Sequence, residues 1–166
     1  MKFRTLRADE IDVRVAMVKE NGLSLLLYKD ARCDMNILDE TVGPLNWQRK
    51  HTRDNANCIV SIWDEAKQQW ISKEDTGTES FTEKEKGLAS DSFKRACFNF
   101  GIGRELYTAP FIWVKKEDAG IKRIGQKWTS NEKFKVEKIA YDGHKNIIGL
   151  AIKNSKGERV FVWQKS

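Results

Sequence analysis

A long amphipathic segment between residues 80 and 103 constrains the fold of this 166-residue chain more than any other feature. Its apolar residues recur at the spacing of one helical face, at Ala89, Phe93, Ala96 or Cys97, and Phe100. Gly101 and Gly103 follow, and glycine readily adopts the left-handed conformation that closes a helix. A helix with a single apolar stripe must bury that stripe against a second layer of structure.

The sequence before this helix contains signals for the start of the helix and for a sheet on which it can pack. Ser80-x-x-Glu83 and Thr82-x-x-Glu85 fit the capping-box pattern, in which a hydroxyl and a carboxylate satisfy free amide donors. Three strand-like stretches precede them, at about Trp47–Arg53, Asn57–Trp63 and Gln69–Lys73. The run "CIVSIW" has the alternation and the β-branched residues that are typical of a strand. We therefore predict an α+β fold in which a three-stranded antiparallel sheet packs on the long helix.

The N-terminal region is ambiguous between helix and strand. Asp9–Val18 has apolar residues at helical spacing, which predicts a helix. The alternation of Val13, Val15 and Met17 leaves a strand as the alternative. Asn21-Gly22 then predicts a turn, and "LSLLLY" after it fits a short buried strand.

A further helix is predicted from Asp30 to about Val42. Asp30 is a suitable N-cap, because its side chain can accept a hydrogen bond from a free amide of the first turn. Gly43-Pro44 ends the segment. The expected apolar face of this helix consists of Cys33, Ile37, Leu38 and Val42.

The last third of the chain predicts an antiparallel β-meander. Its three alternating segments are "FKVEKIAY", "NIIGLAI" and "RVFVWQ", with Asp142-Gly143 and Lys156-Gly157 at the joints. The coarse order of elements is thus helix, strand, helix, three strands, helix and three strands. The chain has no internal repeat and no linker rich in Pro, Gly or Ser, which predicts a single domain over residues 1–166.

Composition predicts a soluble globular protein. Hydrophobic residues make up 40% of the chain and charged residues 33%, which is unlike a disordered chain. No apolar run approaches the roughly 20 residues of a membrane helix, and no secretory signal is visible at the N-terminus. Cys33, Cys58 and Cys97 are far apart and odd in number, which argues against a disulfide framework or a zinc site. A reducing, cytoplasmic location is expected.

The net charge of +6 is concentrated at the C-terminal end. Residues 115–166 carry 13 basic and 6 acidic side chains, whereas residues 61–114 carry 7 and 9. Such a surplus suggests a polyanionic partner, although many basic proteins bind none. Charge alone therefore leaves nucleic-acid binding as one of two equally weighted interpretations.

Motifs for catalysis are missing from the sequence. The two histidines, His51 and His144, have no second metal ligand near them, and the H-E-x-x-H, G-x-S-x-G and phosphate-loop patterns are absent. "GIGRELY" lacks a third glycine and follows a helix instead of opening one, unlike a dinucleotide site. Glu74-Asp75, with Glu79 nearby, could hold Mg²⁺ in a nuclease, but a charged loop is the favoured interpretation. We predict no enzyme, no metal and no cofactor.

Cations on the long helix have two interpretations. Lys86 and Lys94 are eight residues apart, about 2.2 turns, and therefore lie within about 80° of each other around the axis. Arg95 is one turn beyond Asp91 and can pair with it. Taken alone, this pattern favours a solvated face over an anion site. The tryptophans of the predicted strands are likewise expected in the core rather than in base stacking: Trp47, Trp63 and Trp70.

Several separate segments resemble one known family. "TGTESFTEKEKG" and the following "SDSFKRACFNFGIGRELYTAPFIW" closely resemble the Sak-type single-strand annealing proteins of bacteriophages, relatives of the Rad-fifty-two recombination family. Upstream, "YKDARCDMNILDETVGPLNW" resembles the family's arginine-bearing segment and its N-[LI]-x-[ND]-E-x-x-G pattern. That pattern and the Trp after it fall on Asn36, Asp39, Glu40, Gly43 and Trp47. The resemblance covers about residues 10–114.

The resemblance implies a single-stranded DNA-binding and annealing protein for recombination and DNA repair. Such a protein holds the strand in a positive groove, acts as a homo-oligomeric ring or filament, and hydrolyses no nucleotide. It implies a phage- or prophage-encoded protein in the bacterial cytoplasm, with a phage exonuclease or single-strand-binding protein as a candidate partner. The basic meander, residues 120–166, has no counterpart in the family and is expected to extend the annealing core at residues 10–114.

The resemblance also assigns DNA-binding side chains. Lys94 and Arg95 match the helix "K-R" pair of the family, and Lys86 matches a basic position eight residues before it. Arg32 matches the upstream arginine only if one residue is inserted before Asn36. These cations are expected to contact the sugar-phosphate chain.

One departure from the family pattern concerns the inner groove. The human branch has a further cation three residues after the arginine of the pair, and Phe98 stands there in this chain. Arg104 is a candidate to compensate, and Lys84 completes the expected set of DNA-binding cations. A metal-dependent nuclease and an accessory phage protein with a basic tail are the alternatives.

Overall fold

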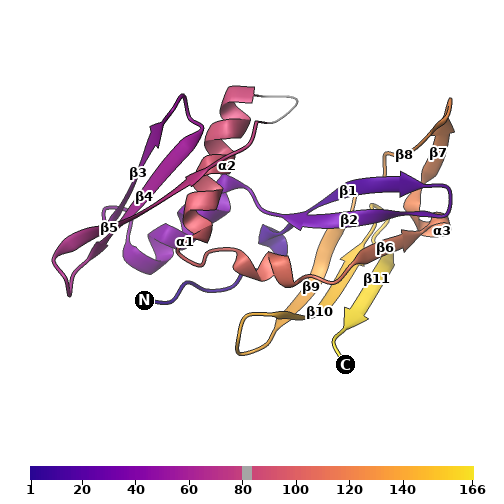
Figure 1. Cartoon of the computed structure of the whole chain (residues 1–166). Helices are drawn as coiled ribbons and strands as arrows, with labels where there is room; N and C mark the ends of the chain where they lie inside the picture. The colour runs from indigo at the N-terminus through magenta and orange to yellow at the C-terminus, as the bar shows by residue number, and fades with distance from the viewer. Residues whose placement is uncertain (80–83) are drawn as a thin grey trace. The chain divides into compact units, whose positions relative to one another are not determined.

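The computed structural model describes residues 1–79 and 84–166, and the side chains of residues 84–86 lie outside this description. The described chain forms two compact units (Figure 1). The first comprises Met1–Arg4 and Asp30–Arg104, and the second comprises Thr5–Lys29 and Glu105–Ser166. Both units combine helical segments with antiparallel sheet, so the predicted α+β class is confirmed. The single domain, the annealing core and its C-terminal extension stay predictions.

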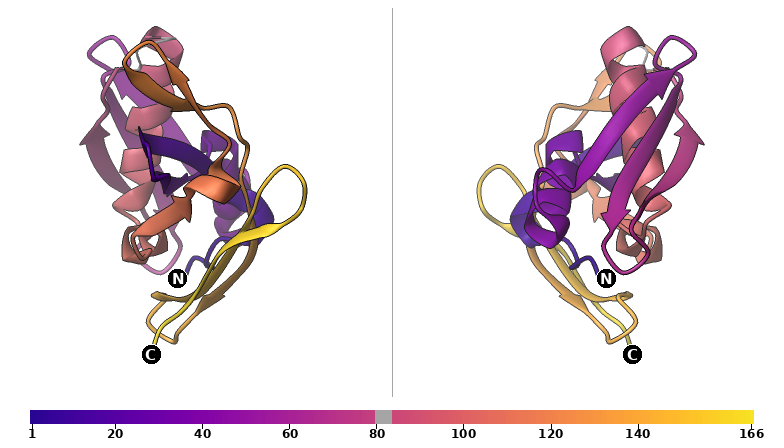
Figure 2. Two further views of the ribbon diagram at one scale, coloured as in Figure 1. Left: turned by 90° about the vertical axis from the view of Figure 1, so that its right-hand side faces the viewer. Right: turned by 90° about the vertical axis from the view of Figure 1, so that its left-hand side faces the viewer.

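The first unit contains two helices and a three-stranded sheet. In chain order its elements are α1 (Ala31–Val42), β3 (Trp47–Thr52), β4 (Asn57–Asp64), β5 (Gln69–Thr76) and α2 (Lys84–Phe98). The strands pair antiparallel in the order β3-β4-β5, and α2 packs on one face of the sheet (Figure 2). This confirms the predicted arrangement of sheet and long helix. The capping-box residues Ser80, Thr82 and Glu83 lie outside the described part of the chain.

Apolar residues of β4 and α2 form one common buried core in this unit. Because successive strand residues point to opposite faces, β4 directs Cys58, Val60 and Ile62 toward α2. None of these three side chains is more than 3% exposed. On α2, Phe93 and Cys97 are fully buried, so the predicted stripe is the buried face of the helix.

Helix α1 begins and ends at the predicted residues. The side chain of Asp30 accepts a hydrogen bond from the backbone N–H of Cys33 at 2.9 Å, and Gly43 ends the helix with φ of +88°. Trp47, the first residue of β3, donates its indole N–H to Asp39 at 2.6 Å. The connection from α1 to the sheet is therefore formed by three residues of the family pattern, Asp39, Gly43 and Trp47.

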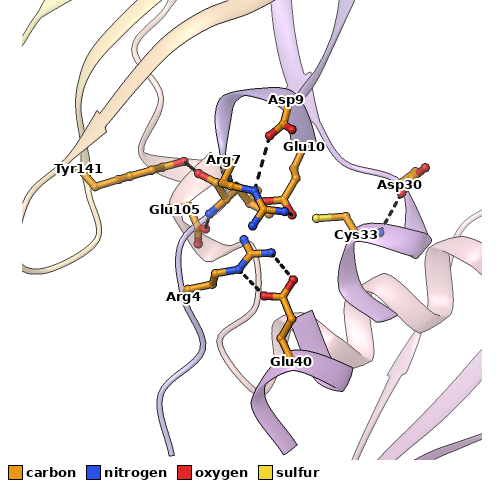
Figure 3. Close-up of polar contacts among 10 residues, drawn as sticks. Arg4, Arg7, Asp9, Glu10, Asp30, Cys33, Glu40, Glu105 and Tyr141 are labelled. Carbon is orange, nitrogen blue, oxygen red and sulfur yellow. Dashed lines mark hydrogen bonds and ion pairs between the residues drawn. The ribbon is translucent and has the colours of Figure 1, made fainter. Parts of the chain in front are cut away.

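Hydrogen bonds with charged and polar side chains also hold the N-terminal segment in place (Figure 3). In the first unit, Arg4 donates two hydrogen bonds to the Glu40 carboxylate, at 2.7 and 3.1 Å. In the second unit, the buried carboxylate of Glu105 accepts from the backbone N–H of Leu6 at 2.8 Å, and the Tyr141 hydroxyl donates to the Leu6 carbonyl at 2.9 Å. A buried carboxylate with a hydrogen-bond donor avoids the penalty of an unsatisfied polar group.

The second unit begins with a β-hairpin where a helix was predicted. β1 (Asp12–Lys19) pairs antiparallel with β2 (Gly22–Tyr28), and only Ala8–Glu10 forms a short 3-10 helix, η1. The helix prediction for Asp9–Val18 is therefore wrong, and the strand alternative is confirmed. The valines of β1 lie opposite leucines of β2, so pairing with an apolar partner decides between two locally allowed patterns.

Close packing explains the glycine of this hairpin. The turn consists of Glu20 and Asn21, and Gly22, which was predicted to lie in the turn, is the first residue of β2. A Cβ atom on Gly22 would clash with the Val114 carbonyl oxygen and with the Trp113 ring. These residues belong to β6 (Ile112–Lys115), which pairs with β2 and completes the sheet β1-β2-β6. Glycine therefore permits the close approach of β6.

The C-terminal strands form the predicted meander. β9 (Lys135–Tyr141), β10 (Ile147–Lys153) and β11 (Arg159–Gln164) pair antiparallel in the order β11-β10-β9. In the second joint Gly157 has a φ of +80°. In the first joint Lys145 adopts the left-handed conformation, with a φ of +66°.

Short elements after α2 are absent from the predicted order. They are η2 (Arg104–Thr108), β6, α3 (Lys116–Ala119), and a hairpin of β7 (Ile121–Ile124) and β8 (Lys127–Ser130). The three strands have four residues each, too few for a reliable periodicity. Within the described residues, none of the helices has the length and apolar character needed to cross a membrane.

Candidate nucleic-acid interface

The Lys-Arg pair lies on α2, away from its buried stripe. Successive helical residues are about 100° apart, so Arg95 lies on the side opposite Phe93 and Lys94 lies at the flank. Arg95 is exposed and Lys94 is half-buried. Lys84 and Lys86 belong to the first turn of α2, but their side chains are outside the described part of the structure. Their role in DNA binding stays a prediction.

Asp91 orients the guanidinium of Arg95. The two side chains form the predicted ion pair one turn apart, at 3.5 Å. The same carboxylate accepts hydrogen bonds from the backbone N–H of Thr78 at 2.8 Å and from the Thr78 hydroxyl at 3.2 Å. Exposed ion pairs are worth at most about 1 kcal/mol, so this contact positions Arg95 without removing its ability to bind an anion.

Arg104 caps the C-terminal end of α2. Its Nε donates to the Phe98 carbonyl at 2.7 Å and a terminal nitrogen donates to the Asn99 carbonyl at 2.9 Å. A cation is favourable there, because the helix dipole leaves partial negative charge on the last carbonyls. The guanidinium lies 5.4 Å from the centre of the Phe98 ring. Positive charge therefore sits beside the position at which the family pattern has its further cation.

Arg32 pairs with the N-cap of its own helix. Its guanidinium lies 3.0 Å from the Asp30 carboxylate, and its side chain is 84% exposed. Burial acts to raise the pKa of Asp30, but the hydrogen bond from Cys33 and the contact with Arg32 outweigh it and lower the pKa. Asp30 is therefore ionised at neutral pH. Whether Arg32 binds DNA together with the α2 cations stays a prediction.

Two cations beside α2 were missed in the sequence. Arg49 of β3 and Lys73 of β5 lie directly opposite Val60, on the two edge strands and on the face of the sheet that α2 covers. The Arg49 guanidinium is 4.8 Å from the centre of the Phe93 ring, and both cations are exposed. Lys73 Nζ donates to the Asn99 carbonyl at 2.8 Å. Strand alternation was the signal, since Arg49 is in phase with the half-buried Trp47 and Lys73 with the half-buried Ile71.

The histidine in this region is neutral at pH 7. Burial lowers the pKa of His51, and the charge of Arg49 lowers it further. His51 Nδ1 lies 3.4 Å from the hydroxyl of the buried Ser92. The positive charge on this side of the unit therefore comes from arginine and lysine side chains.

The carboxylates of the nuclease alternative do not converge. Glu74 and Asp75 are consecutive in β5, so they point to opposite faces of the sheet. Glu74 accepts from the Asn57 amide at 2.8 Å, and Asp75 accepts from the Asn99 amide at 3.1 Å. In the described ranges, no three His, Cys, Asp or Glu side chains are grouped so that they could hold a metal ion. The geometry gives the nuclease alternative no support.

The tryptophans are divided between the two faces of this sheet. Trp47 packs against the buried Phe93, with ring centres 5.9 Å apart, as expected for a core residue. Trp63 and Trp70 form an edge-to-face pair at 5.6 Å on the face away from α2, and Trp70 is 41% exposed. The core prediction is therefore wrong for Trp70, because the strand register turns it away from the helix.

The three cysteines are buried as free thiols in the first unit. Burial raises the pKa of Cys58 to about 11, although the charge of Arg49 opposes the shift. A thiol with this pKa is protonated at neutral pH and is a poor nucleophile. Cys58 therefore acts as a core residue.

These features define an α+β protein in which a three-stranded antiparallel sheet packs on one helix that is bordered by cations. The chain is 32% identical over 97 residues to the single-stranded DNA-binding protein DdrA of Deinococcus radiodurans. That match covers 57% of this chain and 46% of the relative, so the chain matches about half of the relative's length. No protein-family model and no solved structure matches the chain.

Proposed function

We propose that this protein binds single-stranded DNA through the cations around α2 and anneals complementary strands without ATP. The observation that carries the proposal is the set of cations bordering one helix, which consists of Arg49, Lys73, Lys94, Arg95 and Arg104. The partial similarity to a single-stranded DNA-binding protein supports the same partner. A role in recombination and DNA repair, and an origin in a phage or prophage, belong to this proposal.

Annealing requires that the protein bind the DNA strand and leave its base edges accessible. Contacts to phosphate carry no sequence information and leave the base edges free for a second strand to read. Lysine and arginine side chains suit this task. Each phosphate that they neutralise releases a condensed counterion, with a salt slope of about −0.7 per contact for single strands.

Self-assembly strengthens the same contacts. Five cations on one protomer bind a strand weakly, whereas repeated protomers multiply the contacts along one strand. β3 and β5 are the edge strands of their sheet, and unpaired strand edges can pair between subunits. The proposed active form is therefore a homo-oligomeric ring or filament. An exonuclease or a single-strand-binding protein of the phage would work with it.

The decisive experiment measures annealing of two labelled complementary oligonucleotides by energy transfer, without ATP. In the double variant Lys94→Ala, Arg95→Ala we expect strand affinity to fall about 25-fold per protomer at 0.1 M salt, because two contacts with a slope of −0.7 are lost. The matched control is Lys50→Ala, Lys67→Ala. It removes the same charge from the same unit, but Lys50 faces away from α2 and Lys67 lies in the β4–β5 turn.

Normal annealing by the folded Lys94, Arg95 variant contradicts the assignment of the α2 surface. Equal losses in the test and control variants indicate a nonspecific charge effect. An accessory protein whose basic tail binds another protein predicts no retention of single-stranded DNA at about 0.1 M salt, where the Debye length is about 10 Å. Electron micrographs with and without an oligonucleotide test the ring or filament.

A further inference from the structure

The β7–β8 hairpin of the second unit is a basic arm that the proposed function does not use. Gly125 and Gln126 form its two-residue turn, and Gly125 has a φ of +62° with open space around its Cβ direction. The hairpin is anchored at its base, where β8 packs against β1, and it is drawn at the right-hand edge of Figure 1. Residues 119–131 contain three cations and no acidic residue.

The strand register distributes these cations over both faces of the hairpin. Ile124 lies opposite Lys127, and Lys122 is two residues before Ile124 on the same strand, so these three side chains share one face. Arg123 lies opposite Trp128 on the other face, with its guanidinium 5.7 Å from the ring centre. Lys122, Arg123, Ile124 and Lys127 are all exposed.

The lysines of the hairpin have no ion-pair partner among the described side chains. Arg123 donates one hydrogen bond to the Gly125 carbonyl at 3.1 Å. Glu132, beyond the base of the hairpin, accepts from the backbone N–H groups of Ser155 and Lys133, at 3.0 and 2.9 Å. Like charges close together on paired strands repel each other. A bound polyanion would relieve that repulsion.

The two-sided distribution of charge distinguishes a duplex from a single strand. One extended strand can meet only one face of a hairpin, whereas a groove of duplex DNA has a phosphate chain along each wall. Packed sheets are spaced about 10 Å apart, so a single layer with its side chains has about this thickness. The major groove of B-DNA is about 12 Å wide and admits a two-stranded β-ribbon, whereas the minor groove is only about 6 Å wide.

We propose that the β7–β8 hairpin is a duplex-binding arm that enters the major groove of DNA. Lys122 and Lys127, on one face, contact one phosphate chain, and Arg123, on the other face, contacts the opposite chain. The arm lies in the second unit and the α2 cations lie in the first. The arm is therefore independent of the proposed single-strand surface, and each can fail alone.

The test uses the full-length variant Lys122→Gln, Lys127→Gln and a 25-base-pair duplex, with binding followed by fluorescence anisotropy. Each contact has a salt slope of about −0.9, so the two contacts together contribute about 60-fold at 0.1 M salt. We therefore expect the affinity for the duplex to fall by about that factor. The salt slope should become shallower by about 1.8. The matched control, Lys156→Gln, Lys165→Gln, removes two exposed lysines of the same unit and should retain the wild-type slope.

A second probe identifies the groove. A duplex that carries glucosylated hydroxymethylcytosine has its major groove blocked and should bind the wild-type protein more weakly. Distamycin, which occupies the minor groove, should have little effect. An unchanged duplex affinity and salt slope in the folded hairpin variant overturns the proposal. So does an equal loss of affinity for a single-stranded 25-mer, which would assign the hairpin to the single-strand path.

Discussion

The cations around α2 and those of the β7–β8 hairpin are held in different ways. Arg95 is oriented by Asp91, and Arg104 is fixed by two backbone carbonyls at the end of the helix. Lys122 and Lys127 lie on an exposed ribbon without an ion-pair partner among the described residues. The cations around α2 are therefore held by neighbouring groups, whereas those two lysines are exposed and are not held by a described carboxylate.

This difference is consistent with the two kinds of DNA proposed for the two surfaces. Immobilising a flexible side chain on binding costs about 0.5–1.5 kcal/mol, and a side chain that is already held avoids much of that cost. The ordered cations suit a flexible single strand, which loses entropy itself when it binds. The exposed lysines suit a rigid duplex, whose phosphates are already in place and whose charge density is high.

The largest expected effect tests whether α2 is a core element and the hairpin is not. Phe93→Ala removes a fully buried ring that contacts Trp47 and Arg49, and it should lower the free energy of unfolding by about 3–5 kcal/mol. Ile124→Ala, at the exposed hairpin tip, should change it by no more than about 0.5 kcal/mol. Urea unfolding followed by tryptophan fluorescence measures both. A comparable loss in the two variants would show that the hairpin is part of the core.

A smaller effect tests the ordering of Arg95. Asp91→Asn removes a negative charge that competes with phosphate, yet the amide oxygen can still accept from Thr78. If charge dominates, affinity for single-stranded DNA should rise, by at most about fivefold at 0.1 M salt, which is the contribution of one phosphate contact. Titration of a labelled oligonucleotide measures the change. Weaker binding would mean that orientation by Asp91 matters more than its charge.

The smallest expected effect tests whether ion pairs stabilise the β9–β11 meander, in contrast to the β7–β8 hairpin of the same unit. Glu137 pairs with Arg159 at 2.6 Å and with Lys153 at 3.1 Å, and the hydrogen bond from Arg159 is the main cause that lowers the pKa of Glu137 to about 2. Because this pKa is depressed by folding, the stabilisation is present above about pH 4.5 and is lost as the pH falls toward 2.

Glu137→Gln should therefore be less stable than wild type at pH 7 and should approach it near pH 2. Thermal unfolding across this range measures the difference, and Glu117→Gln, in an exposed position of α3, is the control. A difference that persists unchanged at pH 2 would contradict the ion-pair explanation. The meander cations are thus partly neutralised, whereas those of the hairpin are not.

Much of the fold could be predicted from local patterns. The cap at Asp30, the helix end at Gly43 and the buried stripe with Phe93 each depend on residues only a few positions apart. Such signals act within a turn or two of chain, so they persist whatever the tertiary contacts are. The three strands before α2 and the three strands at the C-terminus were predictable for the same reason.

Features that depend on pairing between distant segments were not predictable. Asp12–Lys19 became a strand because β2 offers it an apolar partner, although its sequence also fits a helix. Trp70 became exposed because its register in β5 places it on the face away from α2. For the candidate site, Lys94 and Arg95 were found from the sequence, whereas the positions of Arg49 and Lys73 beside α2 required the register of three strands.

By itself the sequence determined where helices, turns and alternating strands occur, and how much positive charge each region carries. Only the tertiary structure decided which of those charges have partners. Asp91 pairs with Arg95 and Glu137 pairs with Arg159, whereas Lys122 and Lys127 have no ion-pair partner among the described residues. The physical reason is that local structure depends on neighbouring residues, whereas an ion pair or a shared sheet face depends on how distant residues are brought together.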